Sequence, residues 1–245
     1  MKEIKNIILT NSGDISSFNK LIDFGYNIHH FPMIEISHND IKPFSLDDYD
    51  YYIFTSKNGV EAFFNFPFVK VQYEKKVTAI CLGSKTANKI REFGVAPKLI
   101  SSLNYSDGLL EQLIAYEAIK DKKTLLVQGN LAPDNLFSGL KSLCDISRVD
   151  AYQTSLHNSV NIDLQGILEN EKSITVFTSP SSFESFSKLY DPIKTHIVTI
   201  GNTTSDFIKN KGFKPVITSK QQSFEAITEE IIRYFKLNNI QYDIS

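Results

Sequence analysis

The sequence Phe54–Phe64 (FTSKNGVEAFF) has a later counterpart, Phe177–Ser187 (FTSPSSFESFS). In both copies a phenylalanine leads into a Thr-Ser pair, and further aromatic residues follow. The separation of the copies is too long for a solenoid, whose units are roughly 20–50 residues. We therefore expect two copies of one α/β unit.

The repeat continues on both sides of this stretch. Ile80–Thr86 (ICLGSKT) resembles Thr199–Thr204 (TIGNTT), and residues 7–13 (IILTNSG) match residues 125–130 (LLVQGN). Nearly the whole chain is duplicated in this interpretation. Two similar lobes with matching loops suggest a cleft that holds a large, internally repetitive ligand.

Short apolar runs alternate with amphipathic stretches. The runs are typical of strands buried on both faces of a parallel sheet. Helices are predicted over Lys85–Phe93, ended by Gly94, and over Thr204–Lys211, ended by Gly212. The fold class we expect is α/β, with two similar flavodoxin-like lobes that each contain a parallel sheet. The predicted strands are Ile7–Thr10, Tyr51–Thr55, Val77–Leu82, Lys98–Ile100, Thr124–Gln128, Ile174–Thr178, His196–Ile200 and Pro215–Thr218.

Two extended segments interrupt this alternation. Residues 31–36 (FPMIEI) and 149–154 (VDAYQT) occupy matching places in the repeat, and each leads into polar residues. We interpret them as crossings between the lobes, paired as a two-stranded ribbon. The predicted parts are a discontinuous lobe 1 of residues 1–33 and 156–245, a continuous lobe 2 of residues 45–145, and linker strands of residues 34–44 and 146–155.

Composition excludes several classes of function. The 245 residues are 42% hydrophobic and 22% charged, which is ordinary for a globular protein. The net charge of −2 argues against a general nucleic-acid binder, which needs a basic surface. No run approaches the roughly 18 apolar residues of a membrane span, and the N-terminus, Met1–Lys5, has no long apolar region for a signal peptide. We expect no nucleic-acid or membrane partner and a cytoplasmic location.

A metal site is not expected. Cys81 and Cys144 lie far apart in apolar settings and are interpreted as small buried hydrophobes. There is no C-x-x-C, and the adjacent His29 and His30 would point in different directions on a strand. The sequence also lacks a P-loop and a G-x-S-x-G nucleophile elbow.

Several loops share one design, in which a strand ends in small polar residues and a helix begins at once. The free N–H groups and dipole of a helix start favour anions such as carboxylates, and hydroxyl groups add donors. Ser and Thr are also the preferred helix N-caps, so each loop alone has a plain structural explanation. Their repeated placement favours a substrate site. The candidate substrate-binding residues are Thr55, Ser56, Lys57, Ser84, Thr86, Gly129, Asn130, Thr178, Ser179, Ser181, Thr203 and Thr204.

Tyr152 is the candidate catalytic residue. It lies on the second predicted linker strand, between Asp150 and Thr154, and no histidine has an obvious Ser or Cys partner. A tyrosine hydroxyl can donate a proton or a hydrogen bond to a leaving group. The alternative for a strand tyrosine is an amphipathic packing role.

Taken together, these motifs resemble the uroporphyrinogen-III synthase family over nearly the whole chain. The matching runs are residues 32–36, 54–60, 83–87, 149–154, 177–181 and 200–204. The resemblance implies two α/β lobes joined by a two-stranded linker, and a cytoplasmic monomer without a cofactor. It also implies that Tyr152 corresponds to the family's tyrosine.

The resemblance further implies a lyase of tetrapyrrole biosynthesis, the pathway to heme. The substrate would be hydroxymethylbilane, a linear tetrapyrrole octa-acid, which loses water and closes to uroporphyrinogen III with inversion of ring D through a spiro intermediate. Catalysis would rest mainly on orientation of the chain ends. A transient contact with hydroxymethylbilane synthase, which makes the substrate, is left open.

The chain departs from the family at two loops. Residues 128–134 lack the basic residue of many relatives, and Gln222 and Ser223 replace a Pro-Thr pair. Lys57 and Lys85 are candidates to compensate. Two other interpretations remain at this point: a non-catalytic two-lobed cytoplasmic binding module for an anionic metabolite, and a flavodoxin-like protein that would carry a flavin.

Overall fold

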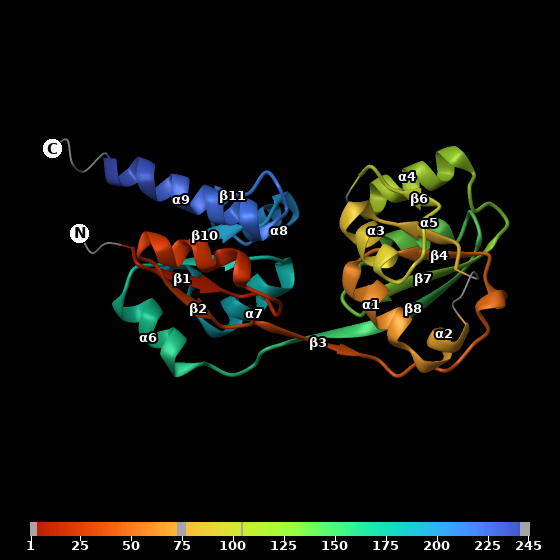
Figure 1. Cartoon of the computed structure of the whole chain (residues 1–245), viewed down its shortest axis with the longest axis horizontal. Coiled ribbons are helices and arrows are strands. Elements are labelled where there is room, and N and C mark those ends of the chain that lie inside the picture. The colour runs from red at the N-terminus through yellow and green to blue at the C-terminus, as the bar shows by residue number, and fades with distance from the viewer. Residues whose placement is uncertain (1–3, 73–76, 104, 241–245) are drawn as a thin grey trace. The chain divides into compact units, whose positions relative to one another are not determined.

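A computed structural model describes residues 4–72, 77–103 and 105–240 (Figure 1). The chain divides into two units, one made of Met1–Glu35 with Ser155–Ser245 and the other of Ile36–Thr154. The first three residues, where we expect no signal peptide, and the last five, which end predicted lobe 1, lie outside the described residues.

Unit 1 is built on a parallel sheet with the strand order β11-β10-β9-β1-β2. In order along the chain, this is the 2-1-3-4-5 arrangement of doubly wound folds such as flavodoxin. The strands are β1 (Asn6–Leu9), β2 (Asn27–His30), β9 (Ser173–Phe177), β10 (His196–Thr199) and β11 (Ile217–Thr218).

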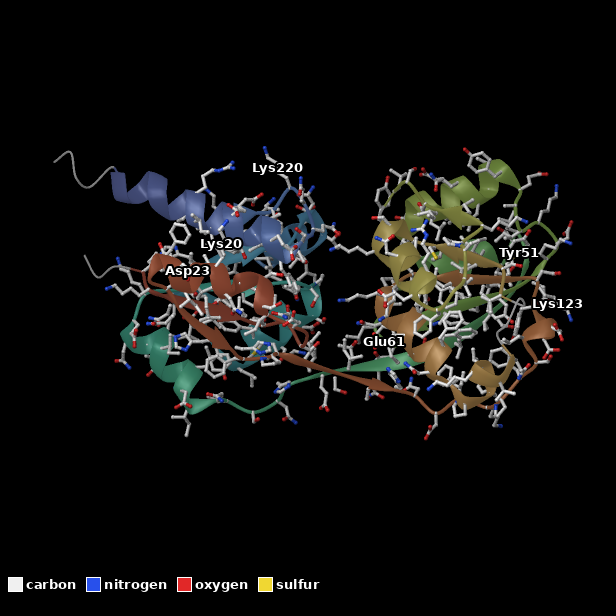
Figure 2. The ribbon with its side chains drawn as sticks, in the orientation of Figure 1. Lys20, Asp23, Tyr51, Glu61, Lys123 and Lys220 are labelled. Carbon is white, nitrogen blue, oxygen red and sulfur yellow. The ribbon has the colours of Figure 1, made fainter. Side chains whose placement is uncertain are left out.

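Helices cover both faces of this sheet. Alternate residues of β1 point to opposite sides, so apolar side chains on each face are buried under a helix layer. Ile7 and Leu9 pack in a cluster with residues of the 3-10 helix η1 and of α9, whereas Ile8 packs with Phe183 and Phe186. Lys20 of η1, which is labelled in Figure 2, lies at the surface. It pairs with Glu229 of α9. The helices are η1 (Ser16–Phe24), α6 (Ile162–Asn170), α7 (Pro180–Leu189), η3 (Pro192–Lys194), α8 (Asn202–Asn210) and α9 (Phe224–Ile240).

Unit 2 contains a six-stranded sheet with the order β3-β8-β7-β4-β5-β6. From β8 to β6 the strands are parallel. They are β3 (Ile34–His38), β4 (Tyr51–Phe54), β5 (Ala79–Cys81), β6 (Leu99–Ile100), β7 (Lys123–Gly129) and β8 (Asp145–Leu156).

The core of unit 2 follows the same alternation. Tyr52 and Phe54 face one cluster, which includes residues of α1 and α3, and Tyr51 and Ile53 face the other, which includes residues of α4 and α5. The helices are η2 (Leu46–Asp48), α1 (Lys57–Asn65), α2 (Pro67–Gln72), α3 (Gly83–Glu92), α4 (Ser106–Tyr116) and α5 (Asn135–Leu140).

The chain changes units within β3 and β8, at Glu35 and Thr154. The Asn39 N–H donates to the Ala151 carbonyl at 3.1 Å, and the His157 N–H donates to that of Met33, also at 3.1 Å. Residue numbers rise along one segment as they fall along the other, so the two run antiparallel. β8 is more than a linker, because it also pairs with β7 from Asp145 to Tyr152.

The predicted α/β class with parallel sheets is confirmed, and each predicted strand is present with ends that differ by at most two residues. Matching the repeats places β7 over β1, β8 over β2, and β4, β5 and β6 over β9, β10 and β11. The order from β8 to β6 then equals the order from β2 to β11. This agreement supports internal duplication, which remains an interpretation.

Candidate functional site

In unit 2 the strand order reverses between β4 and β7. The following helices, α1 and α5, contribute to the clusters on opposite faces of the sheet. In open α/β sheets, ligands bind outside the carboxyl ends of the strands at such a switch point. Ser56 follows β4 and Gly129 ends β7, so both residues stand at this point.

Tyr152 is brought to the same point by a β-bulge. Gln128 of β7 pairs with Asp150, but the next residue, Gly129, pairs with Tyr152, so Ala151 is an extra residue in β8. In a regular strand Tyr152 would point away from the face that Ala151 packs on. Here both residues pack against the cluster that includes Val127. Bulges commonly redirect a side chain in this way next to active sites.

The ring of Tyr152 lies against two glycines. A Cβ atom added to Gly129 would be 2.6 Å from Cε2 and 2.9 Å from Cε1 of the ring. One added to Gly59 would be 3.8 Å from Cε1. The absence of a side chain at Gly129 therefore creates the space that the ring fills.

Ser56 connects the phenol to the start of α1. Its Oγ accepts a hydrogen bond from the Gly59 N–H at 3.0 Å, which makes Ser56 the N-cap of the helix. The same Oγ lies 3.1 Å from the hydroxyl oxygen of Tyr152, and the two hydroxyls share a hydrogen bond. The prediction that small polar residues begin a helix here is confirmed.

Burial raises the pKa of Tyr152 above its ordinary value of 10.0. The hydrogen bond with Ser56 lowers this pKa, and the carboxylate of Asp150 raises it by a smaller effect than burial. Because desolvation disfavours the charged phenolate, the hydroxyl keeps its proton at neutral pH. Tyr152 is therefore available as a proton donor.

Asn130 fixes the backbone that follows Tyr152. Its side-chain oxygen accepts from the Thr154 N–H at 2.8 Å, and its side-chain nitrogen donates to the Thr154 carbonyl at 3.3 Å. Its backbone N–H donates to the Tyr152 carbonyl at 3.2 Å. The amide of Asn130 is thus occupied with the end of β8.

Unit 1 contains the counterpart of the Ser56 loop. Ser179 caps α7 by accepting from the Ser182 N–H at 3.1 Å. Its Oγ lies 3.0 Å from the hydroxyl of Ser181, whereas the corresponding atom of Ser56 meets a tyrosine. The two loops therefore share the cap but differ in the partner of the capping hydroxyl.

The other matching pair of loops begins α3 and α8. Neither N-cap residue, Leu82 or Gly201, makes a side-chain hydrogen bond to the first turn of its helix. Ser84 and Thr203 are exposed there, whereas Thr86 and Thr204 are buried. Of the remaining candidates, Thr55 and Thr178 are half-buried and Lys57 is exposed.

Arg148 is a residue that the sequence analysis missed. From β8 it reaches the loop after β7, where it pairs with Asp134 and lies 3.5 Å from the Ala132 carbonyl. Its Nε also pairs with Asp150 at 2.8 Å. The loop that lacks a basic residue of its own therefore receives one from the neighbouring strand. The one signal in the sequence is that Arg148 and Asp150 are two residues apart on a predicted strand, which places both side chains on the same face.

The second departure from the family also has a structural role in unit 1. The Ser223 hydroxyl accepts from the Ala226 N–H at 3.1 Å and so caps α9. Gln222 lies over the start of α8, because a Cβ atom added to Gly201 would be 3.0 Å from its Cγ. The replacement pair thus covers one helix start and caps another.

Both cysteines are free and buried, as predicted, and burial raises the pKa of Cys81 to about 12. Within the described residues, no group of three or more His, Cys, Asp or Glu side chains is arranged to hold a metal ion. None of the helices in that part of the chain is long and apolar enough to cross a bilayer.

Comparison with known proteins identifies the family. The family model described as uroporphyrinogen-III synthase HemD matches residues 18–229. A relative from Methanocaldococcus jannaschii, provisionally named a uroporphyrinogen-III synthase, is 28% identical over 84% of this chain and 88% of its own length. The porphyrin biosynthesis protein HemD of Ruminiclostridium josui is 25% identical over 72% of this chain, but the match spans only 36% of that protein.

Two solved structures share the fold. Uroporphyrinogen-III synthetase from Helicobacter pylori superposes with a TM-score of 0.69, at 20% identity, over 94% of this chain and 100% of that one. A mutant uroporphyrinogen III synthase from Thermus thermophilus gives 0.67 at 14% identity, over 95% and 99% of the two chains. With the family model matching most of its length, the chain belongs to the uroporphyrinogen-III synthase family.

Proposed function

We propose that the chain catalyses the cyclisation of hydroxymethylbilane to uroporphyrinogen III, with loss of water and inversion of ring D. The observation that carries this proposal is the family match over residues 18–229. The residue that we assign to the chemistry is Tyr152, whose protonated hydroxyl lies at the strand switch point of unit 2.

The reaction begins with departure of the hydroxyl group from the hydroxymethyl carbon. The adjacent pyrrole nitrogen supplies the electron pair, and Tyr152 donates the proton that turns the leaving group into water. The cation that forms is attacked by the substituted α-carbon of ring D, which gives the spiro intermediate. That intermediate breaks one carbon–carbon bond and recloses with ring D inverted. One proton is lost as ring closure is completed, and it balances the proton that Tyr152 gave.

The role of Tyr152 is assistance, because the substrate supplies most of the driving force. Its pKa is raised by burial, so the hydroxyl holds its proton at neutral pH but gives it up reluctantly. The choice of isomer rests instead on holding ring D so that its substituted carbon reaches the cation. This is catalysis by orientation.

We propose that loops of both units bind the carboxylates. The uncapped starts of α3 and α8 offer backbone amides, with the exposed Ser84 and Thr203 beside them. Thr86 and Thr204 are buried, so their contribution would be to shape these loops. The further proposed contacts are Thr55, Lys57, Thr178, Ser179 and Ser181. A monomeric state, a cytoplasmic location and transfer of substrate from hydroxymethylbilane synthase remain predictions.

A coupled assay tests the proposal. Porphobilinogen and a deaminase generate hydroxymethylbilane in the presence of the protein, and the oxidised products are separated by isomer. We expect uroporphyrin III to be the main product. Uroporphyrin I alone, matching a blank without the protein, would contradict the proposal and favour a non-catalytic binding module.

A further inference from the structure

We infer that Ser56 and Gly129 act in the reaction through Tyr152, as positioning residues, rather than by contacting the substrate. This inference rests on the proposed role of Tyr152. Together with the bulge at Ala151, the two residues form what we call the tyrosine seat: Ser56 meets the hydroxyl and Gly129 makes room for the ring.

Ser56 is suited to stabilise Tyr152 after proton transfer. A hydroxyl has one proton to donate and lone pairs to accept with. The Gly59 N–H occupies a lone pair of Ser56 Oγ at 3.0 Å, so the single proton of Ser56 is available to the tyrosine oxygen 3.1 Å away. When Ser56 donates, the phenol can turn its own proton towards a leaving group. Hydrogen bonds to a charged oxygen are the stronger ones, so this bond strengthens as the phenolate forms.

Gly129 controls the position of the ring. A methyl group there would overlap the ring edge, at 2.6 Å from Cε2 and 2.9 Å from Cε1. The backbone on the other side is fixed, because the Asn130 N–H donates to the Tyr152 carbonyl and the Asn130 side chain holds Thr154. The ring cannot yield to a side chain at position 129 without breaking its hydrogen bond to Ser56.

The matching loop of unit 1 shows that a serine can cap its helix without contacting a tyrosine. Ser179 caps α7 in the same manner as Ser56 caps α1, but its hydroxyl bonds to Ser181. The tyrosine contact is therefore an addition to a shared helix-capping design and distinguishes unit 2.

A double-mutant cycle tests the role of Ser56. The variants Ser56→Ala, Tyr152→Phe and the combination are compared for kcat and KM in the coupled assay. We expect Ser56→Ala to lower kcat by about tenfold or more with little change in KM, the size expected for a hydrogen bond to a charged group. In the Tyr152→Phe background the same change should add less than about twofold. Ser56→Thr, which keeps a capping hydroxyl, should restore most of kcat.

Other outcomes would overturn the inference. A rise in KM with Ser56→Ala that persists in the Tyr152→Phe background would make Ser56 a substrate contact. Full loss of kcat in Ser56→Ala with normal kcat in Tyr152→Phe would show that Ser56 does not act through the tyrosine.

A measurement independent of activity separates this inference from the proposed function. The ultraviolet difference between wild type and Tyr152→Phe during alkaline titration reports the pKa of Tyr152. The same difference is then taken between Ser56→Ala and the double variant. We expect the pKa to rise when Ser56 is removed, because its hydrogen bond lowers that pKa. An unchanged pKa would contradict the seat even if isomer III is formed, and a rise would support it even if only isomer I is formed.

Urea unfolding tests the role of Gly129. Gly129→Ala should lower the unfolding midpoint in wild type and in Tyr152→Phe, which retains the ring, but not in Tyr152→Ala, which removes it. Gly166→Ala is the matched control, because no atom within 4 Å would meet the added methyl group in α6, and it should not lower the midpoint. An equal loss for Gly129→Ala in the Tyr152→Ala background would show that the ring is not what excludes a side chain.

Discussion

At the scale of single residues, Tyr152 is distinguished by its surroundings. Its hydroxyl bonds to Ser56, its ring fills the space left by Gly129, and a β-bulge sets its direction, all within unit 2. The surrounding protein disfavours its ionised form, and Ser56 partly offsets this effect. A proton donor with these properties can assist departure of a hydroxyl group without itself ionising at rest.

We predict that Tyr152→Phe lowers kcat by roughly a hundredfold, the lower end of the range for general-acid catalysis, because the ring stays but the proton is lost. The urea midpoint should change little, since only one shared hydroxyl bond is removed. Turnover and unfolding are measured on the same preparation. Tyr116→Phe, at an exposed ring, is the control and should match wild type in both. Normal turnover in Tyr152→Phe would remove the tyrosine from the mechanism.

The pH dependence follows from the direction of the pKa shift. In the folded state the pKa of Tyr152 is above 10.0, so the fold favours the protonated form. Its contribution to stability is complete below the unfolded pKa and is lost as the pH rises through the folded pKa. We expect no loss of kcat from ionisation of Tyr152 at neutral pH, and a fall only as the pH rises through this raised pKa. A titration of kcat with an inflection near pH 8 that disappears in Tyr152→Phe would contradict this.

At the scale of elements, the strands were predictable because buried parallel strands appear as short apolar runs. The cap at Ser56 was also predictable, since small polar residues before a helix have a local physical reason. The bulge at Ala151 was not, because an extra residue leaves no mark on the composition of β8. Nor could the sequence indicate which helix starts lack caps, as Ser84 and Thr203 occur in the same kind of loop as the capping serines.

The role of Arg148 could not be predicted from the sequence either, because it depends on how β8 lies beside β7. We predict that Arg148→Gln lowers the free energy of unfolding by about 1 kcal/mol, because the largely buried Arg148 pairs with both Asp134 and Asp150 and these pairs are lost. Lys120→Gln, which breaks the exposed pair with Glu117, is the control and should cost less than about 0.5 kcal/mol. Equal effects in urea unfolding would mean that Arg148 does not brace the loop.

At the scale of the whole molecule, the five strands of the unit 1 sheet and the five parallel strands of the unit 2 sheet follow the same order, but the two units differ at the capped helix start after β9 and β4. Both have a capped helix start and an uncapped one, at α1 and α3 in unit 2 and at α7 and α8 in unit 1. Only the unit 2 cap bonds to a tyrosine. Repetition in the sequence could predict the shared loops. It could not predict this difference, because Tyr152 reaches its place through a register shift.

The shared loops lead to the last prediction, one for each unit. We expect Thr203→Val in unit 1 and Thr55→Val in unit 2 each to raise KM by about three- to tenfold, the loss of roughly one hydrogen bond. Neither change should alter kcat by more than about twofold, because the proton donor is untouched. The isomer made should remain uroporphyrinogen III, since the attacking carbon of ring D is selected by orientation and not by one carboxylate contact.

The coupled assay gives KM and the isomer ratio together. The controls are Thr203→Ser and Thr55→Ser, which keep the hydroxyl and should behave as wild type. If both valine variants bind and turn over normally, these threonines only shape their loops, and the carboxylates are held by backbone amides alone.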